Sequence, residues 1–86
     1  MKKNTSPEQL FQEIQQILCE HLGADPSQVT ESAELVSDLN ASAGEIEEII
    51  GQLETKYQVH IANAVSELRT VHDLVNAVGE ALNEFF

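Results

Sequence analysis

The sequence predicts an all-α fold, a small bundle of four helices whose third helix is short. Apolar residues recur at helical spacing over three long stretches, as they do in helices that bury one face. Each long stretch also begins with a residue pattern that caps helix N-termini. A length of 86 residues fits one domain. We therefore expect residues 1–86 to form a single domain, with residues 1–5 as a flexible tail.

The first helix is expected over residues 7–22. Ser6 suits its N-cap, Pro7 suits the first helical position, and Gln9 can complete a capping box. Gly23 is typical of a C-terminal stop, because glycine readily adopts the left-handed conformation that ends many helices. The apolar residues that recur at helical spacing between these ends are Leu10, Ile14, Ile17 and Leu18.

A long connection, residues 24–40, follows the first helix. Its Asp-Pro-Ser sequence at positions 25–27 is typical of a turn or a short helical start. A connection of this length is uncommon unless it is packed or functional. We expect its scattered apolar residues to hold it against the helices: Val29, Leu35, Val36 and Leu39.

The second helix is expected over residues 43–57, with Ser42 as its N-cap and Glu45 as the capping-box partner. Gly51 is unusual, because a glycine inside a helix costs about 1 kcal/mol relative to alanine. Either a neighbouring segment approaches closely at Gly51, or the helix is loosened there. The apolar stripe expected to be buried is Ile46, Ile49, Ile50, Leu53 and Tyr57.

Two further helices complete the prediction. A short third helix is expected over residues 62–68. Thr70 followed by Asp73 is a second capping pattern, which predicts a fourth helix over residues 71–85. The apolar residues of this last stretch recur at helical spacing, so it should also bury one face.

Charge and cysteine content restrict the possible functions. The formal net charge is −11 and the sequence pI is about 4.3, which disfavours binding to nucleic acid or to anionic membranes and favours basic protein partners. No apolar run reaches the length of a membrane span. The lone cysteine, Cys19, suits a reducing compartment, and we expect a cytoplasmic monomer in which this thiol is buried and inert.

The stretch 38–45 and the helix after it resemble the acyl carrier protein family. The family pattern reads Asp-Leu-Gly-Ala-Asp-Ser-Leu-Asp and continues into an acidic helix that ends in Leu-Glu-Glu-x-Phe. The Asp-Ser-Leu core of that pattern is replaced here by Ser42, Ala43 and Gly44. The resemblance covers residues 8–82 and implies the family's four-helix fold. The residues that keep the frame are Asp38, Leu39, Ala41, Glu45, Leu53, Glu54 and Tyr57.

The resemblance also implies a prosthetic group. In the family, the motif serine carries 4′-phosphopantetheine, whose thiol holds acyl groups. The ungapped alignment places Ala43 at this position, so we expect a carrier-like domain that lacks the group there. The alternative shifts the alignment by one residue and makes Ser42 the attachment site. The chain would then be an acyl or aminoacyl carrier of fatty-acid, polyketide or related synthesis. An N-cap role for Ser42 is the stronger interpretation.

The acidic face of the second helix is the predicted partner-docking site. The resemblance implies that this face docks on basic patches of partner enzymes, whereas a charged helix face is more generally just the solvated side. Gly44 replaces a large apolar residue, usually leucine, that family members present to their partners. The glutamates expected to dock are Glu45, Glu47, Glu48 and Glu54.

The sequence disfavours an enzyme or a metal-binding module. It has no glycine-rich phosphate loop, no nucleophile elbow and no paired cysteine and histidine. His21, His60 and His72 are too widely separated in sequence to suggest a metal site. A cation-responsive acidic module is a third possibility, but it would need an aspartate-rich loop with ligand spacing, which the chain lacks.

Overall fold

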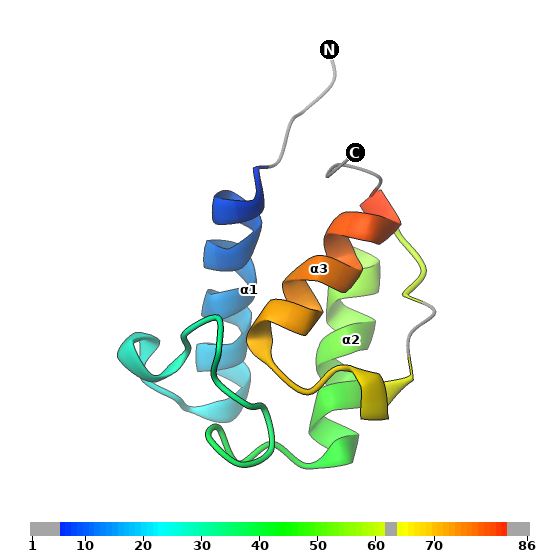
Figure 1. The fold of residues 1–86 in the computed structure, drawn as a ribbon. Coiled ribbons are helices and arrows are strands. Elements are labelled where there is room, and N and C mark those ends of the chain that lie inside the picture. Colours follow the sequence, from blue (N-terminus) through cyan, green and yellow to red (C-terminus); the bar gives the residue numbers. More distant parts are fainter. Residues whose placement is uncertain (1–5, 62–63, 83–86) are drawn as a thin grey trace.

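The structure, a computed structural model, describes residues 6–61 and 64–82. In this part of the chain three α-helices and two 3-10 turns follow one another (Figure 1). The predicted tail, residues 1–5, lies outside the described residues. One isolated antiparallel bridge joins Glu34 and Thr70. The elements are α1 (Pro7–Leu22), η1 (Pro26–Gln28), α2 (Ala43–Tyr57), η2 (Val65–Glu67) and α3 (Val71–Leu82).

The ends of α1 follow from its terminal residues, and the predicted bounds are confirmed. Ser6 Oγ accepts a hydrogen bond from the backbone N–H of Gln9 at 3.1 Å, which satisfies one of the free N–H groups of the first turn. Gly23 has φ of 70° and donates its N–H to the carbonyl of Cys19. The helix therefore ends where only glycine adopts the required conformation without strain.

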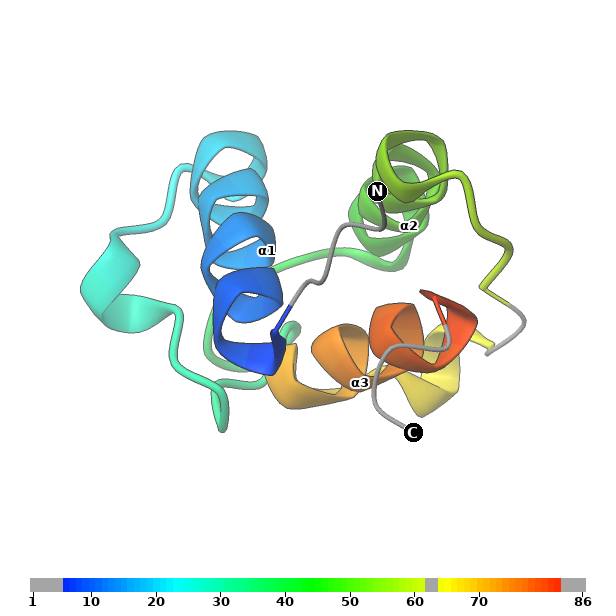
Figure 2. The ribbon, with the colours of Figure 1, turned by 90° about the horizontal axis from the view of Figure 1, so that it is seen from above.

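The three helices pack around one apolar core. α1 and α2 run side by side in opposite directions, and α3 crosses beneath them (Figures 1 and 2). Burying each large apolar side chain stabilises the fold by about 1.5–3 kcal/mol relative to leaving it in water. The side chains buried by the three helices include Leu10, Ile14, Leu18, Ile46, Ile49, Leu53, Val71, Leu74 and Val78.

The connection between α1 and α2 packs onto this core as expected, with one exception. Val29, Leu35 and Leu39 are buried and hold the segment down. Val36 was expected to do the same, but its side chain is 61% exposed. The backbone explains the difference: the N–H of Leu35 bonds to the carbonyl of Arg69 at 2.8 Å, which turns Leu35 inward and leaves the next side chain outside.

The predicted third helix is much shorter than expected. Within residues 62–68 the structure has only the 3-10 turn η2, while positions 62 and 63 lie outside the described residues. The chain after η2 is held extended by the backbone bond from Leu35 to Arg69 and by another from Val71 N to Ala33 O at 3.0 Å. Pairing with this segment ends the helical conformation, and this constraint was not predicted from the sequence.

The start of α3 was predicted correctly. Thr70 Oγ1 accepts from the backbone N–H of Asp73 at 3.1 Å, and Asp73 Oδ2 accepts from the backbone N–H of Thr70 at the same distance. This reciprocal pair is a capping box. The described part of α3 ends at Leu82, so the expected continuation over 83–85 lies outside the described residues. None of the helices described is long and apolar enough to cross a membrane.

Candidate docking surface and prosthetic-group position

The N-terminus of α2 is fixed by Ser42, as predicted. Ser42 Oγ accepts a hydrogen bond from the backbone N–H of Glu45 at 3.1 Å, and Glu45 Oε1 accepts one from the backbone N–H of Ser42 at 2.9 Å. The Ser42 side chain is exposed. It uses an oxygen lone pair in this cap, so its hydroxyl hydrogen remains free to bond elsewhere.

Ala43, the first residue of α2, occupies the position aligned with the family's attachment serine. Its side chain is an exposed methyl group at the edge of a surface hollow. A methyl group has no oxygen or other nucleophilic atom to form a phosphoester. The prosthetic group that the resemblance implies therefore does not fit position 43, and Ser42 is the neighbouring residue with a hydroxyl.

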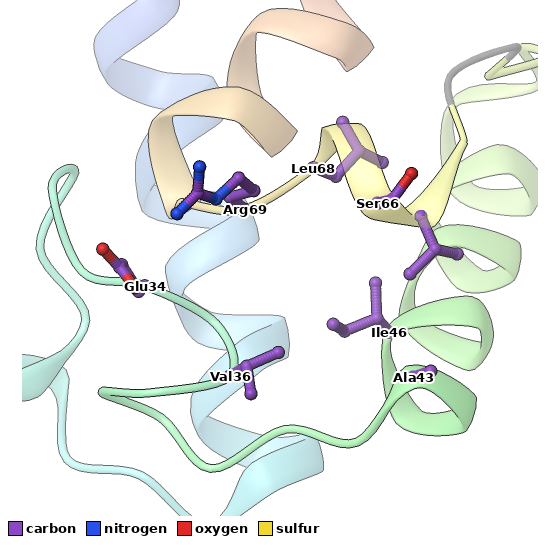
Figure 3. A pocket seen from close by; sticks show the side chains of 8 residues that line it. Glu34, Val36, Ala43, Ile46, Ser66, Leu68 and Arg69 are labelled. Atoms are coloured by element: carbon purple, nitrogen blue, oxygen red, sulfur yellow. The ribbon is translucent and has the colours of Figure 1, made fainter.

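The hollow beside Ala43 has a volume of about 290 Å³ and was not predicted from the sequence. It lies between the connecting segment, the first turn of α2, and η2 with the residues that follow it. Figure 3 shows Val36 facing Ile46 across the hollow, with Glu34 and Arg69 together on one side. Most of its surface is apolar, contributed by Val36, Ala43, Ile46, Val65 and Leu68.

The four predicted docking glutamates do not have equivalent surroundings. Glu47 and Glu48 are exposed. Glu45 is half-buried and forms the cap of α2. Glu54 is also half-buried: its Oε2 accepts a hydrogen bond from the backbone N–H of Ile61 at 2.9 Å. The carboxylates of Glu45 and Glu54 thus bond to the backbone of the fold, whereas those of Glu47 and Glu48 are exposed to a partner.

Glu47 and Glu48 lie on different sides of α2. Glu48 Oε1 is 3.0 Å from Nε2 of His21, which belongs to α1. Glu47 is four residues after Ala43, so both lie on the same side of the helix, toward the hollow. The exposed acidic surface of α2 therefore extends from the contact with α1 to the edge of the hollow.

At its two glycines, Gly44 and Gly51, α2 has space around the backbone. A methyl group placed on Gly51 would meet no heavy atom within 4 Å, so the possibility of a close neighbouring segment is excluded. A methyl group on Gly44 would have only Ser42 Oγ nearby, at 4.0 Å. No side chain of α2 projects outward at these two positions, and a partner could approach the helix closely there.

Cys19 and the three histidines have side chains that can react chemically or bind metals. Cys19 is half-buried, and its pKa is raised by burial first and by Asp25 and Glu20 second. The thiol is therefore protonated and weakly nucleophilic at neutral pH. His72 Nδ1 lies 3.2 Å from Glu31, and each of the three histidines adjoins a different glutamate. Among the described residues, no three potential metal ligands come together.

Comparisons with known proteins identify the family. No protein-family model matches the chain. The acyl carrier protein of Thermotoga maritima is 33% identical over 78 residues, covering 90% of this chain and 96% of the relative. That of Chlamydia muridarum is 35% identical over 75 residues, covering 86% and 97%. That of Helicobacter pylori strain G27 is 39% identical over 70 residues, covering 80% and 90%.

The fold also has a solved counterpart. The apo doublet acyl carrier protein from prodigiosin biosynthesis superposes with a TM-score of 0.74 at 19% identity. The match covers 85% of this chain and 36% of that longer chain. The superposition shows that the two chains share a helical fold. The chain belongs to the acyl carrier protein family, which consists of carriers and not of enzymes.

Proposed function

We propose that this chain is an acyl-carrier-type domain that carries no prosthetic group at position 43 and acts by docking α2 on a basic protein surface. The observation that carries the proposal is Ala43 at the first position of α2, where it offers only a methyl group. The reciprocal cap between Ser42 and Glu45 supports the ungapped alignment, because it gives Ser42 a structural role one residue before the helix.

The docking part of the proposal is supported by charge and exposure. Glu47 and Glu48 are exposed on α2, and the chain as a whole carries a formal net charge of −11. A field of this sign attracts basic surfaces and speeds their association. Glu45 and Glu54 contribute to the field, but their carboxylates are also bound within the fold.

A second candidate function is that of a loaded acyl or aminoacyl carrier with 4′-phosphopantetheine on Ser42. It is favoured by one observation: the Ser42 hydroxyl is exposed, and the cap uses its oxygen as an acceptor only. Capping and attachment are therefore chemically compatible at this residue. In this alternative, the chain would serve fatty-acid, polyketide or related synthesis.

Intact mass separates the two candidates. The full chain is co-expressed with a phosphopantetheinyl transferase of broad range and then weighed by mass spectrometry. We expect the unmodified mass, because position 43 has no hydroxyl. A gain of one phosphopantetheine would contradict the proposal, and loss of that gain in Ser42→Ala would assign the attachment to Ser42. Ala43→Ser provides the positive control, because it restores the family serine in the ungapped frame.

Association kinetics test the docking face. A partner isolated from the source cell is bound to the wild type and to Glu47→Lys/Glu48→Lys at several salt concentrations. The matched control, Glu20→Lys/Glu80→Lys, makes the same charge change at exposed sites on α1 and α3. We expect the α2 reversal to slow association about tenfold while changing dissociation less.

Raising salt should reduce this difference, because the Debye length falls from about 10 Å at 0.1 M to about 3 Å at 1 M. Equal effects of the two double variants would mean that the partner responds to net charge alone. In that case the docking role should not be assigned to α2.

A further inference from the structure

The hollow has an exposed apolar side chain at its edge. Among residues 6–61 and 64–82, Val36 at the edge of the hollow is the one large apolar residue that is mostly exposed, with 61% of its surface accessible. It faces Ile46 across a space of about 290 Å³ (Figure 3). Val36 thus extends the apolar lining of the hollow to the exposed surface, and apolar surface that is contiguous in this way can mark an interaction site.

The shape of the hollow favours a protein side chain over a small molecule. Sites for small molecules enclose about 70–90% of the ligand surface. Here the exposed Val36 stands at the rim, so a ligand confined to the hollow would remain partly in water. A side chain from a partner protein avoids this problem, because the surrounding partner surface covers the rim and excludes water.

The composition of α2 points to the same occupant. Its outward positions hold Gly44, Glu47, Glu48 and Gly51, which supply charge and close approach but no large apolar group. Protein interfaces have an apolar centre within a polar rim. For an interface on α2, the neighbouring hollow can supply the apolar centre.

The charges at the rim specify the partner further. Glu34 and Arg69 lie on the same side of the hollow, so their opposite charges offset one another there (Figure 3). Glu47 follows Ala43, which lines the hollow, by one turn of α2, and its side chain is exposed. A cationic side chain of the partner would therefore be attracted to the α2 edge.

We infer that the hollow receives one large apolar side chain, leucine or phenylalanine, from a basic segment of the partner protein, with a lysine or arginine of that segment beside Glu47. The inference rests on the proposed docking function and names the chemistry of the partner. The hollow would supply most of the binding affinity, and the glutamates of α2 would supply the electrostatic attraction. These two contributions can be measured separately.

Two synthetic helical peptides test the inference on the full chain. Both carry the same lysines and arginines and differ at one central position, leucine in one and alanine in the other. Binding is followed by nuclear magnetic resonance of backbone amides and side-chain methyl groups. We expect the leucine peptide to bind about tenfold more tightly, since it buries a large apolar side chain. It should shift the methyl signals of Ile46, Val65 and Leu68, whereas the alanine peptide should affect mainly Glu47 and Glu48.

Variants locate the effect. Ser66 is an exposed residue lining the hollow, and Ser66→Phe should fill the space and abolish the preference for leucine. Ser27→Phe makes the same change in the other 3-10 turn, η1, and should preserve the preference. Glu47→Lys should weaken both peptides by a similar factor. Amide spectra of each variant show whether the fold is retained.

The possible outcomes separate this inference from the docking proposal. Equal binding of both peptides, weakened by Glu47→Lys, would overturn the hollow's role and leave docking intact. A preference for leucine that is insensitive to Glu47 and Glu48 would support the hollow but contradict electrostatic docking. Sodium decanoate that saturates the Ile46 and Leu68 methyl shifts, without a preference for the leucine peptide, would assign the hollow to a small amphiphile. Absence of binding by either peptide at millimolar concentration would overturn both proposals.

Discussion

Ser42 stabilises the start of α2 through a single oxygen atom. That oxygen accepts the backbone N–H of Glu45, one of the groups at a helix start that have no partner within the helix. Its neighbour Ala43 contributes only a methyl group at the edge of the hollow. The chemical character of this end of α2 therefore depends on which of two adjacent residues carries the hydroxyl.

Replacing Ser42 measures its contribution to stability. Ser42→Ala should lower the free energy of unfolding by about 1 kcal/mol, the usual loss of a serine N-cap. Ser42→Asp should be tolerated, because aspartate accepts the same bond and its negative charge suits the helix N-terminus. Urea unfolding of the three proteins gives the comparison. Equal midpoints for all three would show that the cap does not support α2.

The sequence was sufficient for contacts between near neighbours and insufficient for distant ones. The pairing of Ser42 with Glu45 follows from a spacing of three residues, and it was predicted. Glu54 was assigned to docking because it was placed on the acidic face of the second helix. Its bond to Ile61 depends on the turn after α2, where Gln58 adopts a left-handed φ of 55°. No residue pattern near Glu54 specifies where that turn directs the chain.

The boundaries of the helices were likewise predictable where neighbouring residues set them and not where distant residues do. Local caps define both ends of α1 and the start of α2, and those boundaries were predicted. The third helix was predicted over residues 62–68, but the described residues form only the turn η2 (Val65–Glu67). The C-terminal end of this turn is set from outside the element. The segment following η2 pairs with residues more than thirty positions earlier, through the bridge between Glu34 and Thr70. Helical spacing in the sequence carries no information about that pairing.

Alanine substitutions at Gly51 in α2 and at Gly23 after α1 test whether position 51 is ordinary helix. Neither Gly51 nor Gly23 has a heavy atom within 4 Å of an added methyl group, but Gly23 has φ of +70°. Gly51→Ala should stabilise the protein by about 0.5–1 kcal/mol, because alanine favours the helix and restricts the unfolded chain. Gly23→Ala should destabilise it by about 1–2 kcal/mol, the strain of the left-handed conformation.

Urea unfolding again provides the measurement. A gain in stability for Gly51→Ala alone would identify position 51 as ordinary helix. If Gly51→Ala instead destabilised the protein, α2 would require flexibility or closer packing at that position than its open surroundings indicate.

At the scale of the whole molecule, segments distant in sequence produce both the hollow and the links between helices. The hollow is lined by the connecting segment, α2 and the region around η2, so no single stretch of the sequence could have predicted it. α1 and α2 are linked by His21 with Glu48 and by Tyr57, whose hydroxyl donates to Glu13. Burial, followed by the hydrogen bond and charge of Glu13, raises the pKa of Tyr57 above its usual 10.0.

This raised pKa makes the stability of the molecule sensitive to alkaline pH. Tyr57 is the only tyrosine, so ultraviolet absorbance reports its ionisation directly. Its midpoint should lie above pH 10 in the folded protein and near pH 10 in urea. As pH rises past 10, the unfolded chain loses the proton first, so the contribution of Tyr57 to stability declines.

Tyr57→Phe should lower the free energy of unfolding by about 1 kcal/mol at pH 8, the usual value of a hydrogen bond. The difference from wild type should shrink as pH rises above 10. A folded-state midpoint at pH 10, with a difference independent of pH, would show that the Tyr57–Glu13 link does not hold the two helices together.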